Sequence, residues 1–131
     1  MTETSSLLTM AADAARHAAL RQTVIARNIA NSDTPGYAAR DLVDFASLMQ
    51  RGGGDFVVTA TRAGHAGAAS GLSRDLIIRD AAPGTTTPDG NSVALEDQMV
   101  RAADARRQHD LALTLYRKSI DLMRLGLGRA R

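Results

Sequence analysis

Residues 28–37 read Asn-Ile-Ala-Asn-Ser-Asp-Thr-Pro-Gly-Tyr, and they separate an alanine-rich helical pattern from the rest of the chain. Thr34 precedes a proline, which disfavours the α conformation, and Pro35 has no N–H to donate. Pro35 and Gly36 suit the central positions of a type II turn, because glycine accepts a positive φ. The polar residues before Thr34 can bond the last free carbonyls of a helix. The stretch predicts a helix end, a tight turn, and Tyr37 as an anchor beyond it.

Taken residue by residue, this pattern is equally compatible with an ordinary helix end followed by a turn. Taken whole, Asn-Ile-Ala-Asn-x-x-Thr-Pro-Gly-Tyr resembles the N-terminal signature of the flagellar rod and hook proteins. The residues that carry the resemblance are Asn28, Asn31, Thr34, Pro35, Gly36 and Tyr37.

Two further segments are similar to the small subunits of the proximal rod in this family. Ala39-Arg40-Asp41, with Asp44-Phe45 after it, resembles the continuation of the signature, and Asp89-Gly90-Asn91-Ser92-Val93 resembles the lead into the last helix. One of two sister subunits is favoured, and FlgC is the alternative. The chain departs from the family pattern in an apparent extra residue between Asp41 and Phe45, in Ala94 where a polar residue is expected, and in His109 near a usual tyrosine.

The N-terminal pattern predicts a helix over residues 5–31. Apolar residues recur at alternating spacings of four and three on one seam, which is interrupted by Arg21. This seam holds Leu7, Ala11, Ala14, Ala18 and Ile25, and Leu8, Ala15, Ala19 and Ile29 widen it. Because alanine buries little surface, the helix is expected to be partly disordered in a free monomer and to become ordered against neighbouring subunits.

The middle of the chain predicts short elements and turns. Residues 40–50 favour a short helix with Leu42, Phe45, Leu48 and Met49 turned inward. Residues 56–59 and 76–78 are β-type runs that could pair as a small hairpin. Residues 80–91 contain two prolines and two glycines and are expected to form a turn-rich strap.

Residues 92–127 carry the most regular pattern, with Ser92 as a candidate N-cap. Ten positions alternate by four and three, which predicts a helix about 50 Å long with a coiled-coil seam. The expected assembly seam is Leu95, Met99, Ala102, Leu113, Tyr116, Ile120, Met123 and Leu127. Arg106 and His109 interrupt it. They are either solvent-exposed, snorkelling side chains or polar residues that set the register between helices.

Composition excludes several classes of protein. The 131 residues contain no cysteine, which excludes disulfides and thiolate metal sites, and only 3% aromatic residues. Residues 91–131 carry eight basic and five acidic side chains, so the charge is mixed rather than a basic stripe for nucleic acid. We expect no transmembrane helix and no cleaved signal peptide.

Catalytic and cofactor sites find little support in the sequence. His17, His65 and His109 share no metal-ligand spacing, and Ser70 lacks a nucleophile-elbow frame. His17 is expected to face solvent. Three consecutive glycines at residues 52–54 lack the Gly-Lys-Ser/Thr of a phosphate loop. We therefore expect no enzyme activity, no catalytic residue, no cofactor and no metal.

The predicted fold is mainly α, with two long terminal helices packing as a coiled-coil-like pair and a small irregular or β-hairpin middle. The expected parts are residues 1–50, a flexible middle over residues 51–91, and residues 92–131, with the terminal helices forming one discontinuous domain.

The resemblance implies a structural subunit of the proximal rod of the bacterial flagellar basal body, which connects the membrane ring to the distal rod and transmits torque. The implied partners are FlgC, FlgF, FlgG, FliE, the MS ring, copies of itself and the type III export apparatus. The implied location is the rod in the periplasmic space. From the residues alone, the alternative is a helical coiled-coil adaptor or a weak nucleic-acid-binding module, whose affinity would depend on salt.

Overall fold

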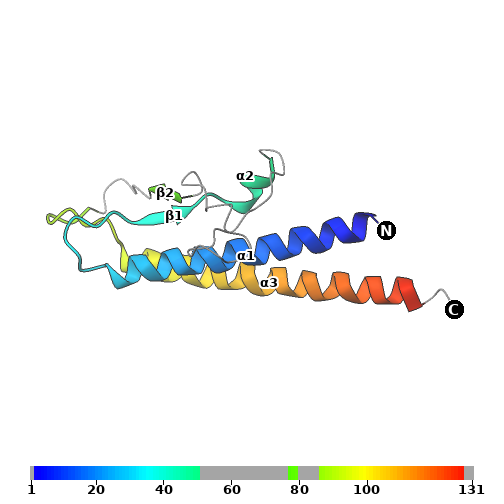
Figure 1. The fold of residues 1–131 in the computed structure, drawn as a ribbon. Helices are drawn as coiled ribbons and strands as arrows, with labels where there is room; N and C mark the ends of the chain where they lie inside the picture. The colour runs from blue at the N-terminus through cyan, green and yellow to red at the C-terminus, as the bar shows by residue number, and fades with distance from the viewer. Residues whose placement is uncertain (1, 51–76, 80–85, 129–131) are drawn as a thin grey trace, which may run out of the picture. The chain divides into compact units, whose positions relative to one another are not determined.

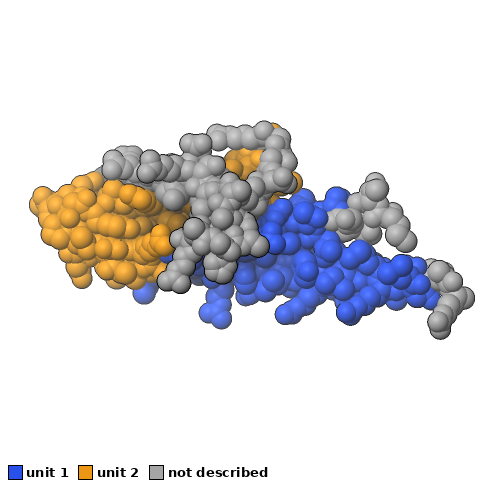
Figure 2. All heavy atoms as spheres, in the orientation of Figure 1, with its two compact units in different colours: residues 1–23, 99–131 blue, residues 24–98 orange. Residues whose placement is uncertain are grey.

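The computed structural model describes residues 2–50, 77–79 and 86–128. Its elements in chain order are α1 (Thr2–Ala30), β1 (Arg40–Leu42), α2 (Phe45–Gln50), β2 (Ile77–Arg79) and α3 (Leu95–Gly128) (Figure 1). The fold is mainly helical, with long terminal helices that pack together, as the sequence predicts. The chain divides into two compact units, and both long helices contribute to each (Figure 2).

Unit 1 contains residues 1–23 and 99–131, so it pairs the first part of α1 with most of α3. The two helices run in opposite directions, and their contact is built from small side chains. The small buried residues are Ala11, Ala15 and Ala18 on α1 and Ala105, Ala112 and Ser119 on α3, and His17 of α1 is buried with them. Because the distance between packed helices depends on the side chains at the contact, these residues allow a close approach.

The predicted seam of α1 agrees with the buried face in part. Ala11, Ala18 and Ile25 are buried, and Ala15 from the widened seam joins them, whereas Ala19 is exposed. The expectation for His17 is wrong, because this side chain is only 3% exposed. The buried face of α1 is therefore wider than the seam that periodicity alone defines.

Unit 2 contains residues 24–98 and holds the end of α1, the small sheet, α2 and the beginning of α3. The sheet pairs β1 with β2 in antiparallel register, with Asp41 opposite Ile78. Residues 77–79 thus pair with residues 40–42, a partner that the sequence did not predict, and the predicted hairpin between residues 56–59 and 76–78 stays a prediction. The other predicted strand, residues 56–59, lies outside the described residues.

The helix predicted over residues 40–50 is shorter than expected. Residues 40–42 form β1, and only Phe45–Gln50 are helical. Leu42 is buried in the strand, Phe45 and Leu48 are half-buried on α2, and Met49 is 45% exposed instead of turned inward. A three-residue strand is too short to show its period of two in a sequence.

The last helix begins at Leu95 rather than after Ser92. The N–H of Gln98 donates to the carbonyl of Ala94 at 3.0 Å, which makes Ala94 the N-cap residue. The expectation that Ser92 caps the helix is wrong, because its hydroxyl oxygen accepts a hydrogen bond from the N–H of Ala39 at 2.8 Å.

Candidate functional site

Three buried amide side chains hold unit 2 together, and we call Asn28, Asn91 and Gln98 the amide network. Their exposed fractions are 0%, 2% and 2%, respectively. Polar side chains of this kind are seldom buried unless all their hydrogen bonds are made, because an unpaired buried group is costly. Each amide is therefore best understood through its partners.

Asn28, in the last turns of α1, uses its whole hydrogen-bonding capacity. Its Nδ2 donates to the carbonyl of Arg40 at 2.7 Å and to Oε1 of Gln98 at 2.9 Å. Its Oδ1 accepts from the N–H of Arg40 at 3.1 Å and from the hydroxyl of Tyr37 at 3.3 Å. One side chain thus connects the helix end to the chain leaving the turn and to the beginning of α3.

The two bonds between Asn28 and the backbone of Arg40 explain why this residue begins a strand. The side-chain amide donates to the carbonyl and accepts from the N–H of the same residue. It therefore supplies the pair of bonds that a neighbouring strand would supply. The N–H and C=O of an extended Arg40 are therefore hydrogen-bonded on the side that faces Asn28. The other edge of β1 pairs with β2.

Asn91 binds the signature stretch from the strap that precedes α3. Its Nδ2 donates to the carbonyls of Asn31, Ser32 and Thr34 at 3.0, 2.8 and 2.8 Å. Since an amide carries only two protons, these three acceptors share them. The Oδ1 atom of Asn91 accepts from the N–H of Val93 at 2.8 Å. Asn91 thus connects the carbonyls of the helix end and of the turn to the strap, and it adds a second hydrogen bond to those of Asn31 and Thr34, which also accept backbone N–H groups.

The turn itself has the geometry that the sequence predicts. Gly36 has φ of 69°, and the N–H of Tyr37 donates to the carbonyl of Thr34 at 3.2 Å, as in a type II turn. Asn31 also acts as expected, because its Nδ2 donates to the carbonyl of Arg27 at 2.8 Å.

The strap meets the turn through its own backbone. The N–H of Gly36 donates to the carbonyl of Asp89 at 2.9 Å, and the N–H of Ser92 donates to the carbonyl of Tyr37 at 3.0 Å. Gly90 also has a positive φ, of 84°, and a Cβ built there would lie 3.5 Å from Cα of Gly36. The two segments therefore lie in direct backbone contact.

The Thr87 hydroxyl donates a hydrogen bond to the carboxylate of Asp89. This bond lowers the pKa of Asp89 from its ordinary value of 3.8, and the N–H of Asn91 adds to the effect. Both interactions favour the charged carboxylate. The strap therefore keeps a negative charge beside the turn.

The sequence predicts one turn from the six signature residues. The structure joins this turn region to Asn91, Ser92 and Gln98, which were not among the predicted site residues. Asn28, Asn31, Thr34 and Tyr37 make the side-chain or backbone bonds described above, while Pro35 and Gly36 lie on the exposed surface. Asn91 and Ser92 stood in a segment that resembles the family, which was the available signal. No local sequence signal marked Gln98, because its partner Asn28 lies 70 residues away in the chain.

The expected assembly seam of α3 is divided between two environments in the single chain. Its half-buried members are Ala102, Leu113, Tyr116, Ile120 and Met123, and its exposed members are Leu95, Met99 and Leu127. The face that α3 buries is defined by Gln98, Ala105, Ala112 and Ser119, which recur every seven residues. Contact between subunits through the expected seam remains a prediction.

The two candidates for setting the register do not lie in this buried face. Arg106 is exposed, and the side chain of His109 is 31% exposed, with its Nδ1 3.9 Å from Oδ1 of Asp110. Neither residue is a buried polar group within the chain. A role in aligning subunits remains a prediction that the single chain does not test.

The arrangement of the amide network supports mechanical fixation of a helix end. Residues 2–50, 77–79 and 86–128 contain no group of three or more histidine and acidic side chains that could hold a metal ion. Within the same ranges, neither long helix is apolar enough over a sufficient length to cross a membrane. The side-chain amides of Asn28 and Asn91 bond to the turn, the strand and the beginning of α3, so they fix the geometry of a helix end.

Comparison with known proteins gives consistent matches. Residues 8–37 match the family model described as "Flagella basal body rod protein". The chain is 30% identical to the flagellar basal body rod protein FlgB of Agrobacterium fabrum over 94% of its own length and 93% of the relative. It is 40% identical to FlgB of Salmonella typhimurium over 74% and 75% of the two chains, and 38% identical to FlgB of Escherichia coli over 73% and 74%.

Proposed function

Because the chain belongs to the FlgB family of flagellar basal body rod proteins and is a structural subunit of that rod, we propose that it assembles through its two terminal helices. Membership decides between the sister subunits, since the relatives are FlgB rather than FlgC. It also favours a rod subunit over a helical adaptor or a nucleic-acid-binding module. The family locates the chain in the basal body, among other rod components.

The observation that carries the proposal is a contrast between the buried and the exposed side chains of α3. The side packed on α1 buries small residues, while large apolar side chains remain exposed: Met99, Val100, Leu111, Leu115, Leu122, Leu125 and Leu127. Transfer of apolar surface out of water lowers the free energy. Neighbouring subunits that cover these side chains would therefore stabilise the subunit beyond what its own fold provides.

We propose that the subunit joins the membrane ring to the distal rod and carries torque along packed helices. Its neighbours in this proposal are FlgC, FlgF, FlgG, FliE, the MS ring and copies of itself. It reaches the periplasmic part of the rod through the type III export apparatus. The role is structural, and no reaction is assigned to it.

The test is a strain that lacks this protein, complemented with the wild-type chain or with a variant. The deletion is expected to abolish swimming and to remove the rod from isolated basal bodies, and the wild-type chain is expected to restore both. A deletion strain that swims normally and yields complete rods would refute the assignment to the rod.

Gly36→Val tests the turn within the same strain. Valine is strained at a φ of 69°, so the variant is expected to reduce swimming more than it reduces the amount of protein. Ala26→Val is the matched control, because Ala26 is an exposed residue of α1 outside the turn. Normal swimming with Gly36→Val would count against the role of the turn.

A further inference from the structure

A second apolar pattern follows the C-terminal half of α3, outside the face packed on α1. Leu111, Leu115, Leu122 and Leu125 fall at alternating spacings of four and three, with Lys118 in the central position, and we call these five residues the leucine stripe. The leucines are 60%, 44%, 55% and 70% exposed, respectively. Such spacing in an exposed helix is the pattern of a seam that packs against another helix.

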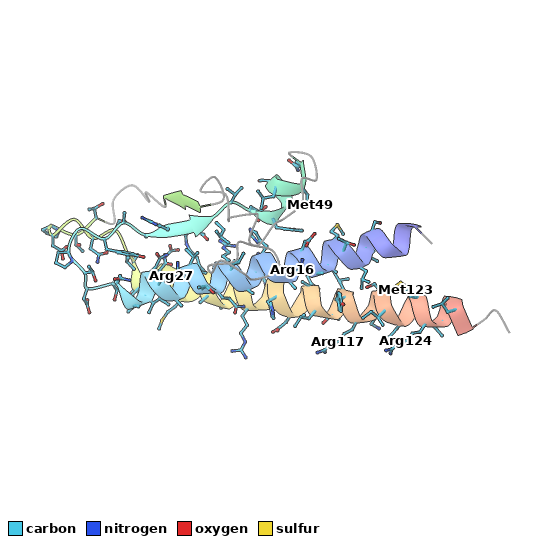
Figure 3. All side chains as sticks on the ribbon, viewed as in Figure 1. Arg16, Arg27, Met49, Arg117, Met123 and Arg124 are labelled. Atoms are coloured by element: carbon cyan, nitrogen blue, oxygen red, sulfur yellow. The ribbon has the colours of Figure 1, made fainter. Side chains whose placement is uncertain are left out.

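The leucine stripe occupies a defined flank of the helix. Successive residues of a helix are about 100° apart, so the stripe lies between the buried positions Ala112 and Ser119 and the opposite side of α3. Arg117 and Arg124 mark that opposite side, pointing away from α1, while Met123 lies toward α1 (Figure 3). None of the stripe residues belongs to the predicted assembly seam.

Lys118 determines what kind of helix fits the stripe. It is exposed, and it makes no ion pair within the part of the chain that the structure describes. A two-fold partner stripe from a second copy, parallel or antiparallel, would bring one Lys118 against the other. Like charges at facing positions disfavour such a pairing, whereas an acidic side chain at that position favours it.

We propose that the leucine stripe docks an amphipathic helix of another rod subunit that carries an aspartate or glutamate opposite Lys118 within its apolar seam. The docked helix would extend the contact already made by α1, because the stripe borders the buried face of α3. The lysine sets the register and excludes self-pairing, as single polar residues do in coiled coils. This inference rests on the proposed function.

The experiment uses the full-length chain and two synthetic helical peptides with leucines at four-three spacing. The peptides differ in one central seam residue, which is glutamate in one and lysine in the other. Fluorescence anisotropy is expected to show that the glutamate peptide binds about tenfold more tightly, and that Lys118→Glu reverses this preference.

Matched variants separate the stripe from general charge. Arg117→Glu makes the same change of charge one residue away on the opposite side, and it is expected to leave the preference for the glutamate peptide intact. The double variant with Leu115→Gln and Leu122→Gln is expected to weaken the binding of both peptides by about tenfold. Circular dichroism checks that each variant keeps the helical content of the wild type.

Three results would overturn the inference. In the first, Lys118→Glu leaves the preference unchanged. In the second, Arg117→Glu alters it as much. In the third, sedimentation shows that the wild-type chain dimerises and that the leucine double variant does not, which would assign the stripe to a second copy.

The deletion strain distinguishes this inference from the proposed function. Normal swimming without the protein would end the proposed function, whatever the peptides show. If the deletion strain does not swim but Lys118→Glu restores swimming as well as Arg117→Glu does, the rod assignment stands and the stripe is refuted. Loss of swimming with Lys118→Glu alone supports both.

Discussion

The two units hold their helices by opposite means. In unit 1 the buried side chains among the described residues of α1 and α3 are five alanines, one serine and His17, and Ala105 and Ser119 are fully buried. In unit 2 the amides Asn28 and Gln98 are buried along with the apolar Ile25, and they are bonded to each other. One contact is set by the volume of small groups, and the other by donors and acceptors.

This difference has a physical consequence for assembly. Small apolar contacts bury little area, so the alanine seam contributes little stability by itself and tolerates neighbours that add to it. The amide network is specific, because each partner must keep its position for the others to stay satisfied. We infer that unit 2 fixes the direction in which the chain leaves α1, while unit 1 gains most of its order from contacts between subunits.

Asn28→Ala is the change expected to destabilise unit 2 most strongly. It removes four hydrogen bonds, which leaves the part-buried backbone of Arg40 and the buried Oε1 of Gln98 without these partners. We expect a loss of about 3 kcal/mol in the free energy of unfolding of unit 2, measured by urea denaturation with amide exchange at Tyr37. Asn31→Ala is the control, because Asn31 is a more exposed asparagine in the same helix end. Equal effects of the two changes would show that the network is no stronger than an ordinary cap.

Ala105→Leu tests the other side of the comparison. Ala105 is 0% exposed, so a larger side chain must push the helices of unit 1 apart, at a cost of about 2 kcal/mol. The melting temperature of the helical signal reports the loss. Ala103→Leu is the matched control at an exposed position of the same helix, where it is expected to be neutral. An Ala105→Leu variant as stable as the control would mean that the alanine seam is not closely packed.

The sequence predicted the elements that depend on local patterns. Both long helices follow from apolar spacing, and the turn at Pro35 and Gly36 follows from restrictions on φ. The buried face of α3 was not found, because pattern reasoning favours large apolar side chains such as Met99 and Leu113. The single chain instead buries Ala105, Ala112 and Gln98, whose type does not mark them as core.

Contacts between distant parts of the chain account for the remaining errors. Asn28 was recognised as part of a signature, but its bonds to Gln98 and Arg40 depend on the folded arrangement of unit 2. The same bonds hold Arg40 extended, where the local pattern favoured a helix. The local pattern favours Ser92 as an N-cap because serine is common at that position, but its hydroxyl oxygen accepts a hydrogen bond from the N–H of Ala39 instead.

Ala94→Ser is expected to stabilise unit 2, which would increase the difference in stability between the two units. Ala94 is the N-cap residue of α3 and has no side-chain oxygen to accept from the free N–H groups of the first turn. A serine there is expected to add about 1 kcal/mol to the free energy of unfolding. The control is Ala103→Ser, within the same helix and exposed, where serine is neutral or slightly unfavourable. If both changes had the same effect, another group would already cap the helix.

The smallest expected effect concerns the strap that carries Asn91. Thr87→Val removes the hydroxyl that lowers the pKa of Asp89, so that pKa is expected to rise toward 3.8 in a carboxyl-carbon NMR titration. Thr86→Val, an exposed neighbour, is expected to leave it unchanged. Because the pKa is lowered in the folded protein, the stabilisation is present above pH 3.8 and is lost as the pH falls through the folded value. The wild type and Thr87→Val should therefore differ in stability less below that range than at neutral pH. A pKa that stays low without the Thr87 hydroxyl would transfer the effect to the N–H of Asn91, and would make the backbone of the strap the source of its order.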